Sequence, residues 1–343
     1  MPHPDQTVEL LAAPGARAWG RFADRPRVVR PADEFPGRIR HALQDWRTKE
    51  WVGFTLVHPE LYGSMIVQEA KYLASSELYV CDAASGELHE HSGSMKGGTV
   101  GLPADLLHGG RVRFADPRRH YRLEVDFDED AGHHTVFVEI GASDRAAAIS
   151  CELVLRTRGA SGPLAVSTPL QRGAAMFTYK RAFPAAGTLR VGDREFAFDP
   201  ARDLAIVDEH RTHLPYWTHW IWGTFASIGP DGVVGANLCV RDQLGEDEES
   251  CLWLGGAAEP LEELAFTATG SHPLAPWAVA SEDGRVELMF TPAGRKGVKK
   301  ELLVAAIDYT QLYGTYAGVL HGADGPVPIE DVHGVLELME MRS

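Results

Sequence analysis

Alternation of apolar and polar residues with a period of two is the feature that most constrains this chain. Between residues 121 and 127, Tyr, Leu, Val and Phe occupy every second position, and Arg, Glu and Asp lie between them. Such a segment forms a β-strand with one buried face and one solvated face. A turn-rich segment at 128–132 and an apolar run at 136–140 follow, which predicts a β-hairpin.

The hairpin pattern recurs along the chain. Gly and Asp in short turns separate paired apolar runs within 189–198, 220–240, 278–290 and 313–329. These residues tolerate the positive φ angles that tight hairpin turns require. Helical spacing is confined to the segment from Phe35 to Trp46 and to one further turn predicted at 103–108.

These elements predict an all-β fold. Many antiparallel strands with few short helices are typical of sandwiches and barrels, and 343 residues are long for one barrel. We expect two antiparallel β-barrels in tandem, with an N-terminal arm at 1–40, a first barrel at 41–205 and a second at 206–343. The polar, loop-like stretch at 200–214 is the expected seam. Neither a phosphate-binding loop nor strand–helix alternation is present, so no cofactor is predicted.

The charge balance disfavours nucleic acid as a partner. The 48 acidic and 33 basic residues give a net charge of -15, which repels phosphate backbones. The basic residues form one cluster near the start of the chain, which comprises Arg17, Arg21, Arg25, Arg27, Arg30, Arg38 and Arg40. This cluster could contact anionic lipid headgroups at a membrane surface. The favoured interpretation is a solvated arm that packs across an acidic body. No transmembrane segment, secretory signal or paired cysteine motif is found, which predicts a cytoplasmic protein with reduced thiols.

The aromatic segment 208–225 holds the densest group of candidate site residues. In a strand beginning near Trp217, Trp220 and Trp222 share one face and His219 lies on the other. These rings could be barrel core or the wall of a ligand pocket. Asp208 and His210 precede them, and a carboxyl group at an apolar barrel mouth is expected to have a raised pKa.

Other side chains are candidates for contact with a ligand. Tyr179 lies on a strand before the seam, although core packing is the more ordinary role, and Gln311 and Tyr313 begin the last long strand pair beside glycines. The predicted ligand-binding residues are Tyr179, Tyr216, Trp220, Trp222, Asn237, Trp277, Gln311 and Tyr313. A metal site at His210, His213 and His219 is not predicted, because such spacing arises often by chance and two of these histidines lie in the expected loop.

Several motifs together resemble a bacterial family catalogued as domain of unknown function 2804. They are 177–180 (Phe-Thr-Tyr-Lys), Asp208 ahead of 214–216 and 220–222, 235–238 (Gly-Ala-Asn-Leu), 276–277 and 311–318. That family is more distantly similar to tandem lipocalin-like proteins such as carotenoid hydratase and tocopherol cyclase. The resemblance implies two barrels side by side and a hydrophobic ligand of the lipid or isoprenoid class. Glu209 departs from the family pattern, which has Trp after the Asp.

Three functions fit these residues. As a hydratase, cyclase or isomerase, the chain would protonate a C=C bond with a neutral Asp208 aided by His210. Aromatic faces would stabilise the cation by about 0.5–2 kcal/mol each; those expected are Tyr216, Trp220, Trp222 and Trp277. Alternatively, the chain is a carrier that binds an apolar molecule without changing it, or a scaffold with filled barrels. The oligomeric state is not indicated by the sequence.

Overall fold

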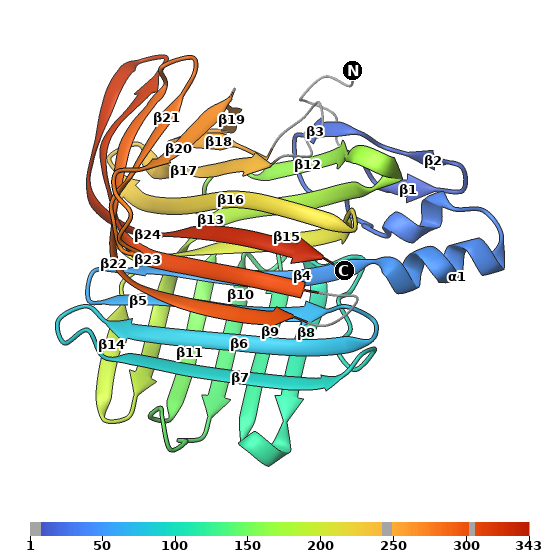
Figure 1. The fold of residues 1–343 in the computed structure, drawn as a ribbon, viewed down its shortest axis with the longest axis horizontal. Helices are drawn as coiled ribbons and strands as arrows, with labels where there is room; N and C mark the ends of the chain where they lie inside the picture. Colours follow the sequence, from blue (N-terminus) through green and yellow to red (C-terminus); the bar gives the residue numbers. More distant parts are fainter. Residues whose placement is uncertain (1–7, 242–248, 262, 302–305, 343) are drawn as a thin grey trace.

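Two curled antiparallel sheets account for most of the backbone (Figure 1). The computed structural model describes residues 8–241, 249–261, 263–301 and 306–342. One sheet curls into a near-barrel and the other into a half-barrel, which confirms the prediction of an all-β fold with tandem lipocalin-like barrels. Within the described residues, no helix is long and apolar enough to cross a bilayer.

The first sheet follows the order β7-β6-β5-β4-β15-β13-β11-β10-β9-β8, with β12 and β14 also paired to β13 and β3 paired to β12. Its strands are β3 (Gly20–Phe22), β4 (Lys49–His58), β5 (Leu61–Glu69), β6 (Leu73–Asp82), β7 (Leu88–Lys96), β8 (His108–Asp116), β9 (Tyr121–Asp128), β10 (His133–Ile140), β11 (Ile149–Arg156), β12 (Leu164–Pro169), β13 (Ala175–Val191), β14 (Arg194–Phe198) and β15 (Leu204–His213). The expected hairpin is confirmed, since Tyr121 on β9 pairs with Ile140 on β10.

Strand β13 turns the first sheet back on itself. Residues 175–184 pair with β15, whereas residues 185–191 pair with β11. Gly187, shortly after the change of partner, has a φ of +130°, and a Cβ atom there would lie 2.1 Å from the carbonyl oxygen of Glu152, so only glycine fits. Strands β9–β11 consequently run steeply across β4–β7 (Figure 1), and the alternating apolar residues of both groups fill the enclosed core.

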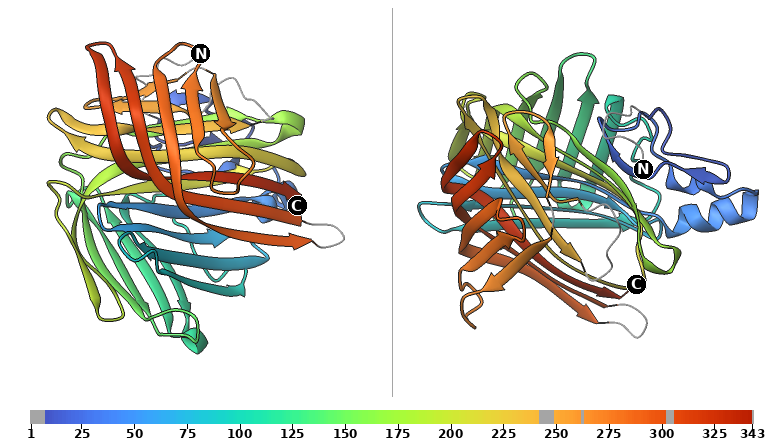
Figure 2. Two further views of the ribbon diagram at one scale, coloured as in Figure 1. Left: turned by 60° about the vertical axis from the view of Figure 1, so that its left-hand side comes forward. Right: turned by 90° about the horizontal axis from the view of Figure 1, so that it is seen from above.

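The second sheet follows the order β19-β18-β17-β16-β24-β23-β22-β21-β20. Its strands are β16 (Trp217–Gly229), β17 (Gly232–Arg241), β18 (Cys251–Leu254), β19 (Ala258–Pro260), β20 (Leu264–Ala268), β21 (Trp277–Ser281), β22 (Val286–Glu301), β23 (Ala306–Gly322) and β24 (Gly325–Arg342). The hairpins predicted around the turns at 230–232, 282–284 and 322–325 are all present. Figure 2 shows the strong curl of this sheet.

Short elements cover the first 47 residues and two connections. They are β1 (Ala12–Ala13), β2 (Ala16–Arg17), the 3-10 turns η1 (Pro31–Glu34), η2 (Pro117–Arg119) and η3 (Gln171–Gly173), and the helix α1 (Arg38–Arg47). Helix α1 confirms the prediction for 35–46. The turn predicted at 103–108 is wrong, because that segment is irregular and leads directly into β8.

The prediction that residues 200–214 form a loop between the two barrels is also wrong. Residues 204–213 form β15, which pairs with both β4 and β13 and lies inside the first sheet. Its charged residues lie in ion pairs, and all of them except the partly exposed Asp208 are buried, so they are not parts of a loop. The chain passes to the second sheet between His213 and Trp217, and not at 205 as the domain boundaries assumed.

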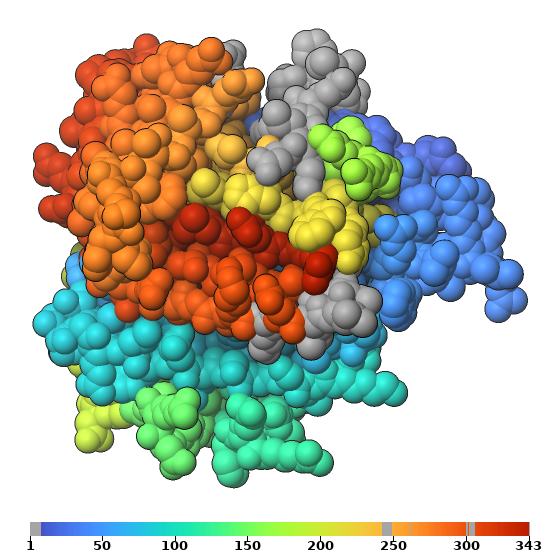
Figure 3. Space-filling view, viewed as in Figure 1, coloured from blue at the N-terminus to red at the C-terminus, as the bar shows by residue number. Residues whose placement is uncertain are grey.

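The second sheet packs against the first (Figures 2 and 3), on the face of the first sheet opposite to its enclosed core. Two apolar clusters join the sheets. One contains Ala182 and Ile206 of the first sheet and Trp253 of the second. The other contains Tyr79 of the first sheet and Trp222 of the second. Burial of these side chains on both sides holds the two sheets together by the hydrophobic effect.

The N-terminal arginines are not simply a solvated arm. Arg25 is buried and its guanidinium contacts the Glu209 carboxylate, with Nε 2.6 Å from Oε2. Arg17 is buried and donates to Ser167 Oγ at 3.0 Å, and Arg21 donates to the carbonyl oxygen of Ser250 at 2.9 Å. These residues therefore fasten the N-terminal segment to the body, and the exposed arginines of this cluster include those of α1.

Candidate functional site

A buried cluster of charged side chains begins on the face of β13 and β15 that packs against the second sheet. The register places Lys180 beside Asp208 and Thr178 beside His210. Lys180 Nζ lies 3.4 Å from Asp208 Oδ2 and 3.1 Å from Glu249 Oε2. The Lys180 side chain is 1% exposed. A buried ammonium group is stable only when paired, and these two carboxylates pair it.

His210 is held in this cluster by three neighbours. Its Nε2 lies 2.9 Å from Thr178 Oγ1 and 3.1 Å from Asp208 Oδ1. Trp51 of β4 stacks on its ring at a centroid distance of 4.5 Å. Burial lowers the pKa of His210 to about 4, despite the opposing effect of Asp208. The imidazole is therefore neutral at pH 7.

Asp208 does not have the raised pKa that the sequence suggested. Burial alone raises the pKa of this carboxyl, but the charge of Lys180 and contact with His210 outweigh that effect, so the pKa is lowered. Asp208 is an anion at neutral pH because its cationic partner is buried with it. It is therefore poorly suited to donate a proton.

The second sheet supplies the opposite wall. The Trp222 ring lies 4.3 Å from Lys180 Nζ, in a cation–π contact. Trp222 Nε1 donates to Asn237 Oδ1 at 2.8 Å, and Asn237 Nδ2 donates to the backbone carbonyl of Glu249 at 2.7 Å. Arg241 forms an ion pair with the Glu249 carboxylate. This chain of contacts fixes both the indole ring and the carboxylate beside Lys180.

Glu337 on β24 is the second carboxyl group with a shifted pKa in this region. Trp220 Nε1 donates to its Oε1 at 2.8 Å, and Tyr309 Oη and Gln311 Nε2 donate to its Oε2 at 2.9 and 3.3 Å. Burial raises the pKa of Glu337; the bonds from Trp220 and Tyr309 oppose this, and the negative charge of Asp208 reinforces it. Asp208 and Glu337 thus have pKa values shifted in opposite directions.

Aromatic side chains surround these polar groups. Tyr79 and Tyr313 lie with ring centroids 5.5 Å apart across the two sheets. The buried atoms Tyr79 Oη, Gln311 Oε1 and His210 Nδ1 have no hydrogen-bond partner among the described residues. Buried polar atoms without partners are uncommon, and each of them calls for an explanation such as an ordered water, a bound polar group or a catalytic role.

The other face of β15 carries a separate ion network inside the first barrel. Glu209 accepts bonds from Arg25 and from Arg211 Nε, the latter at 2.8 Å. Arg211 Nη1 also donates to Glu50 Oε1 at 2.9 Å. The side chains of Arg25, Glu50, Glu209 and Arg211 are all buried. Because side chains alternate along β15, Glu209 and Arg211 point away from Asp208 and His210. Glu209, the departure from the family pattern, therefore belongs to the barrel interior.

The structure brings together seven of the ten sequence-predicted site residues, namely Asp208, His210, Trp220, Trp222, Asn237, Gln311 and Tyr313. It does not place the other three with them. Tyr179 lies in the core of the first barrel, Trp277 packs against the core of the second sheet, and Tyr216 is 47% exposed.

Several members of the cluster were not predicted from the sequence, among them Lys180, Glu249, Tyr309 and Glu337. A lysine within the apolar run 175–185 and a glutamate within 335–339 are signals that could have identified two of them. The partner of each, however, depends on strand register and on the contact between sheets. Register pairs Glu337 with both Trp222 and Gln311.

The three histidines considered for a metal diverge. His213 Nε2 lies 2.8 Å from Thr48 Oγ1 and 3.1 Å from the carbonyl oxygen of Gln44, away from His210, and His219 is on the face of β16 opposite to Trp220. In the part of the chain that the structure describes, no group of three or more His, Cys, Asp or Glu side chains is arranged to hold a metal ion.

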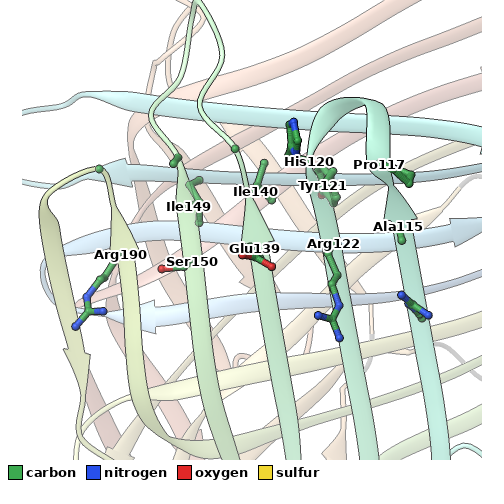
Figure 4. Close-up of a pocket in the computed structure, with 14 residues that line it drawn as sticks. Ala115, Pro117, His120, Tyr121, Arg122, Glu139, Ile140, Ile149, Ser150 and Arg190 are labelled. Carbon is green, nitrogen blue, oxygen red and sulfur yellow. The ribbon is translucent and has the colours of Figure 1, made fainter.

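Two open hollows lie elsewhere. One, of about 630 Å³, is at the hairpin ends of β8–β11 and is lined by Arg113, Arg122, Glu139 and Arg190 (Figure 4). Its arginines pair with nearby carboxylates, for example Arg122 with Glu124 at 2.7 Å. The other, of about 500 Å³, lies at the ends of β16, β22, β23 and β24. We place the candidate site at the inter-sheet cluster because its charges are buried and its pKa values are shifted in opposite directions.

Comparisons with known proteins agree on the fold. The crystal structure of a protein from Nitrosomonas europaea described as AttH is 14% identical over 86% of this chain and 93% of its own, with a TM-score of 0.52. The structure of CghA with Sch210972 is 13% identical over 86% of this chain and 89% of its own, with a TM-score of 0.53. No curated protein matches the sequence. The family model described as domain of unknown function (DUF2804) matches residues 34–342, and the chain belongs to that family.

Proposed function

We propose that the inter-sheet site binds an apolar or amphipathic small molecule and protonates a C=C bond in it. Glu337 is the proton donor in this proposal, in place of the Asp208 that the sequence suggested. The observation that carries it is a pair of partly buried carboxyl groups in one cluster whose pKa values are shifted apart, Glu337 upward and Asp208 downward. A carboxyl group whose pKa is raised is a better general acid near neutral pH than an ordinary glutamate, and a neighbouring carboxyl group whose pKa is lowered stays ionised beside it.

The proposed reaction needs no acid other than Glu337. The Glu337 proton and the π electrons of the alkene form a new C–H bond, which leaves a carbocation. Addition of water and loss of a proton from the added oxygen gives hydration, and loss of a proton from the neighbouring carbon gives isomerisation. Attack by a second double bond closes a ring and moves the cation to a new carbon, and loss of a proton beside that carbon completes cyclisation. Each route releases one proton, which restores Glu337 to its acid form.

The surroundings suit a cationic intermediate. The rings of Trp220 and Trp222 lie on the Glu337 face of the second sheet, and a π-face stabilises a desolvated cation by about 2 kcal/mol. The Asp208 carboxylate adds an opposite charge in a buried site, where electrostatic interactions are stronger than in water. Lys180 keeps Asp208 ionised and thus prevents it from competing with Glu337 for the proton.

Ligand binding by this fold also has a precedent in CghA, which was crystallised with Sch210972. A lipid or isoprenoid alkene is the substrate class that the aromatic lining favours. Non-catalytic carriage of the same class of molecule is the alternative, since the three donors to Glu337 would also hold a carboxylate that has only a structural role.

Deuterium incorporation tests the chemistry even while the substrate is unidentified. The purified protein is incubated in D2O with a lipid extract, and mass spectrometry identifies molecules that gain one non-exchangeable deuterium. Glu337→Gln should abolish that gain while retaining bound ligand. Glu340→Gln, an exposed glutamate on the same strand, is the matched control. A stoichiometric ligand recovered unchanged from wild type would instead establish a carrier, and deuterium gain that survives Glu337→Gln would refute the role of Glu337.

A further inference from the structure

Helix α1 projects from the body of the protein as an unpacked amphipathic element (Figures 1 and 3). None of its ten residues is buried. Ile39 is 88% exposed, Leu43 56% and Trp46 54%. These three are spaced by four and three residues, so on a helix of about 3.6 residues per turn they form one continuous ridge. A folded protein rarely leaves such a ridge in water unless it contacts something.

The ridge points to solvent because the opposite face of the helix is held. His41 Nε2 lies 3.0 Å from Asp33 Oδ1 on η1, and His213 Nε2 at the end of β15 lies 3.1 Å from the carbonyl oxygen of Gln44. Thr48, directly after the helix, also contacts His213. The helix is thus fixed in one orientation on the first sheet, with its apolar ridge facing outward.

Arginines flank the ridge on both sides. Helical geometry places Arg38 along one edge and Arg40 and Arg47 along the other, and all three are exposed. The chain as a whole carries a net charge of -15, so this helix is a local basic surface on an acidic protein. A narrow apolar face bordered by arginines is the pattern of helices that lie in the interface of an anionic membrane.

Aromatic residues extend the exposed surface beyond the helix. Tyr72, in the turn between β5 and β6, is 54% exposed, and its ring centroid lies 6.2 Å from that of Trp46. Leu73 next to it is 44% exposed. Trp and Tyr prefer the headgroup region of a bilayer, where an apolar ring and a polar edge are both accommodated.

We propose that α1, with Tyr72 and Leu73, docks on the surface of a membrane that contains anionic phospholipids. A second copy of this chain is a weaker candidate partner, because three ridge side chains are far fewer than the roughly 20 residues a side of a stable dimer. The acidic body and the basic helix also give the protein a fixed orientation toward an anionic surface. This inference does not depend on the proposed chemistry.

Vesicle flotation tests the docking surface. The full chain is mixed with vesicles of phosphatidylcholine alone or of phosphatidylcholine with phosphatidylglycerol. We expect binding to the anionic vesicles that decreases with salt. Joint replacement of Arg38, Arg40 and Arg47 by Gln should weaken it by on the order of 100-fold. Ile39→Asn with Leu43→Asn should weaken it by at least about tenfold. Because these side chains are exposed, all variants should retain the wild-type circular dichroism and melting temperature.

The control pair is Val154→Asn with Met289→Asn, two apolar residues that are 38% and 39% exposed on other strands. It should bind like wild type. A dye at Leu43→Cys reports insertion directly, since the four native cysteines are buried and will not be labelled. Equal binding to neutral and anionic vesicles, or helix variants that bind like wild type, would overturn the proposal. So would self-association that the ridge variants abolish in the absence of lipid.

Discussion

The ion network inside the first barrel allows a quantitative prediction for Glu209→Gln. Glu209 is fully buried and accepts three charge-assisted hydrogen bonds, from Arg25 Nε, Arg25 Nη2 and Arg211 Nε, at 2.6 to 2.8 Å. Glutamine has almost the same shape but no charge. Arg211 would keep its ion pair with Glu50, whereas Arg25 would be left buried without a carboxylate. Removal of one member of a buried ion pair costs about 3–5 kcal/mol.

The pKa of Glu209 gives an order-of-magnitude comparison for the stabilisation by its negative charge. Burial raises this pKa, but Arg25 and Arg211 lower it to about 2 from an ordinary value of 4.5. A difference of about 2.5 units at about 1.4 kcal/mol each corresponds to roughly 3 kcal/mol of folding stability at pH 7. Because the folded-state pKa is depressed, this contribution is present above pH 4.5 and is lost as the pH falls toward 2.

Thermal unfolding followed by circular dichroism measures the effect. For a sheet of this size, 1 kcal/mol shifts the melting temperature by about 2–4 °C, so Glu209→Gln should lower the transition of the first sheet by roughly 6–12 °C at pH 7. Glu195→Gln is the control: Glu195 is 44% exposed and pairs with the exposed Arg190, so its loss should cost under about 1 kcal/mol. Equal shifts for the two variants would refute the assignment of Glu209 to a stabilising network.

Two further predictions concern protonation and packing. Burial lowers the pKa values of His210 and His213 to about 4, so between pH 6.5 and 4 the unfolded chain binds protons that the folded chain does not. Stability should therefore fall as the pH drops, by about 2 kcal/mol for each histidine at pH 5, and calorimetry of a variant with both changed to Gln should show a weaker pH dependence. At Gly223, a Cβ atom would lie 2.3 Å from Tyr316 Oη, so Gly223→Ala should destabilise the second sheet by about 1–3 kcal/mol in denaturant titrations, whereas Gly256→Ala, with open space around it, should not.

Strand and hairpin positions were predictable from the sequence because they depend on local patterns. Residues 121–127 and the turns with Gly and Asp show which face is buried and where the chain reverses, and the structure agrees. The spacing of Ile39, Leu43 and Trp46 likewise identified α1. Nothing in that spacing indicated that the ridge faces solvent, since an amphipathic helix usually packs its apolar side on a core.

The candidate site was only partly predictable because its members meet through long-range register. Asp208 and Trp222 stood out in the sequence, but Glu337 becomes their neighbour only when β24 pairs with β16 and the two sheets pack together. Lys180 reverses the expected protonation of Asp208 from the adjacent strand. The run 208–213 was mistaken for a loop because charged residues usually lie in solvent, and their buried partners cannot be identified from local sequence.

Strand β15 contributes to the candidate site with one face and to the interior of the first barrel with the other, and Glu209 lies on the interior face. Side chains alternate, so Asp208 and His210 face the second sheet while Glu209 and Arg211 face the barrel interior. An apolar residue at 209 would pack in that interior without a charged partner. Glutamate there requires Arg25, which belongs to the N-terminal segment before the first long strand. Glu209 therefore has a structural role: it ties the N-terminal segment to β15 on the face opposite to Asp208 and His210.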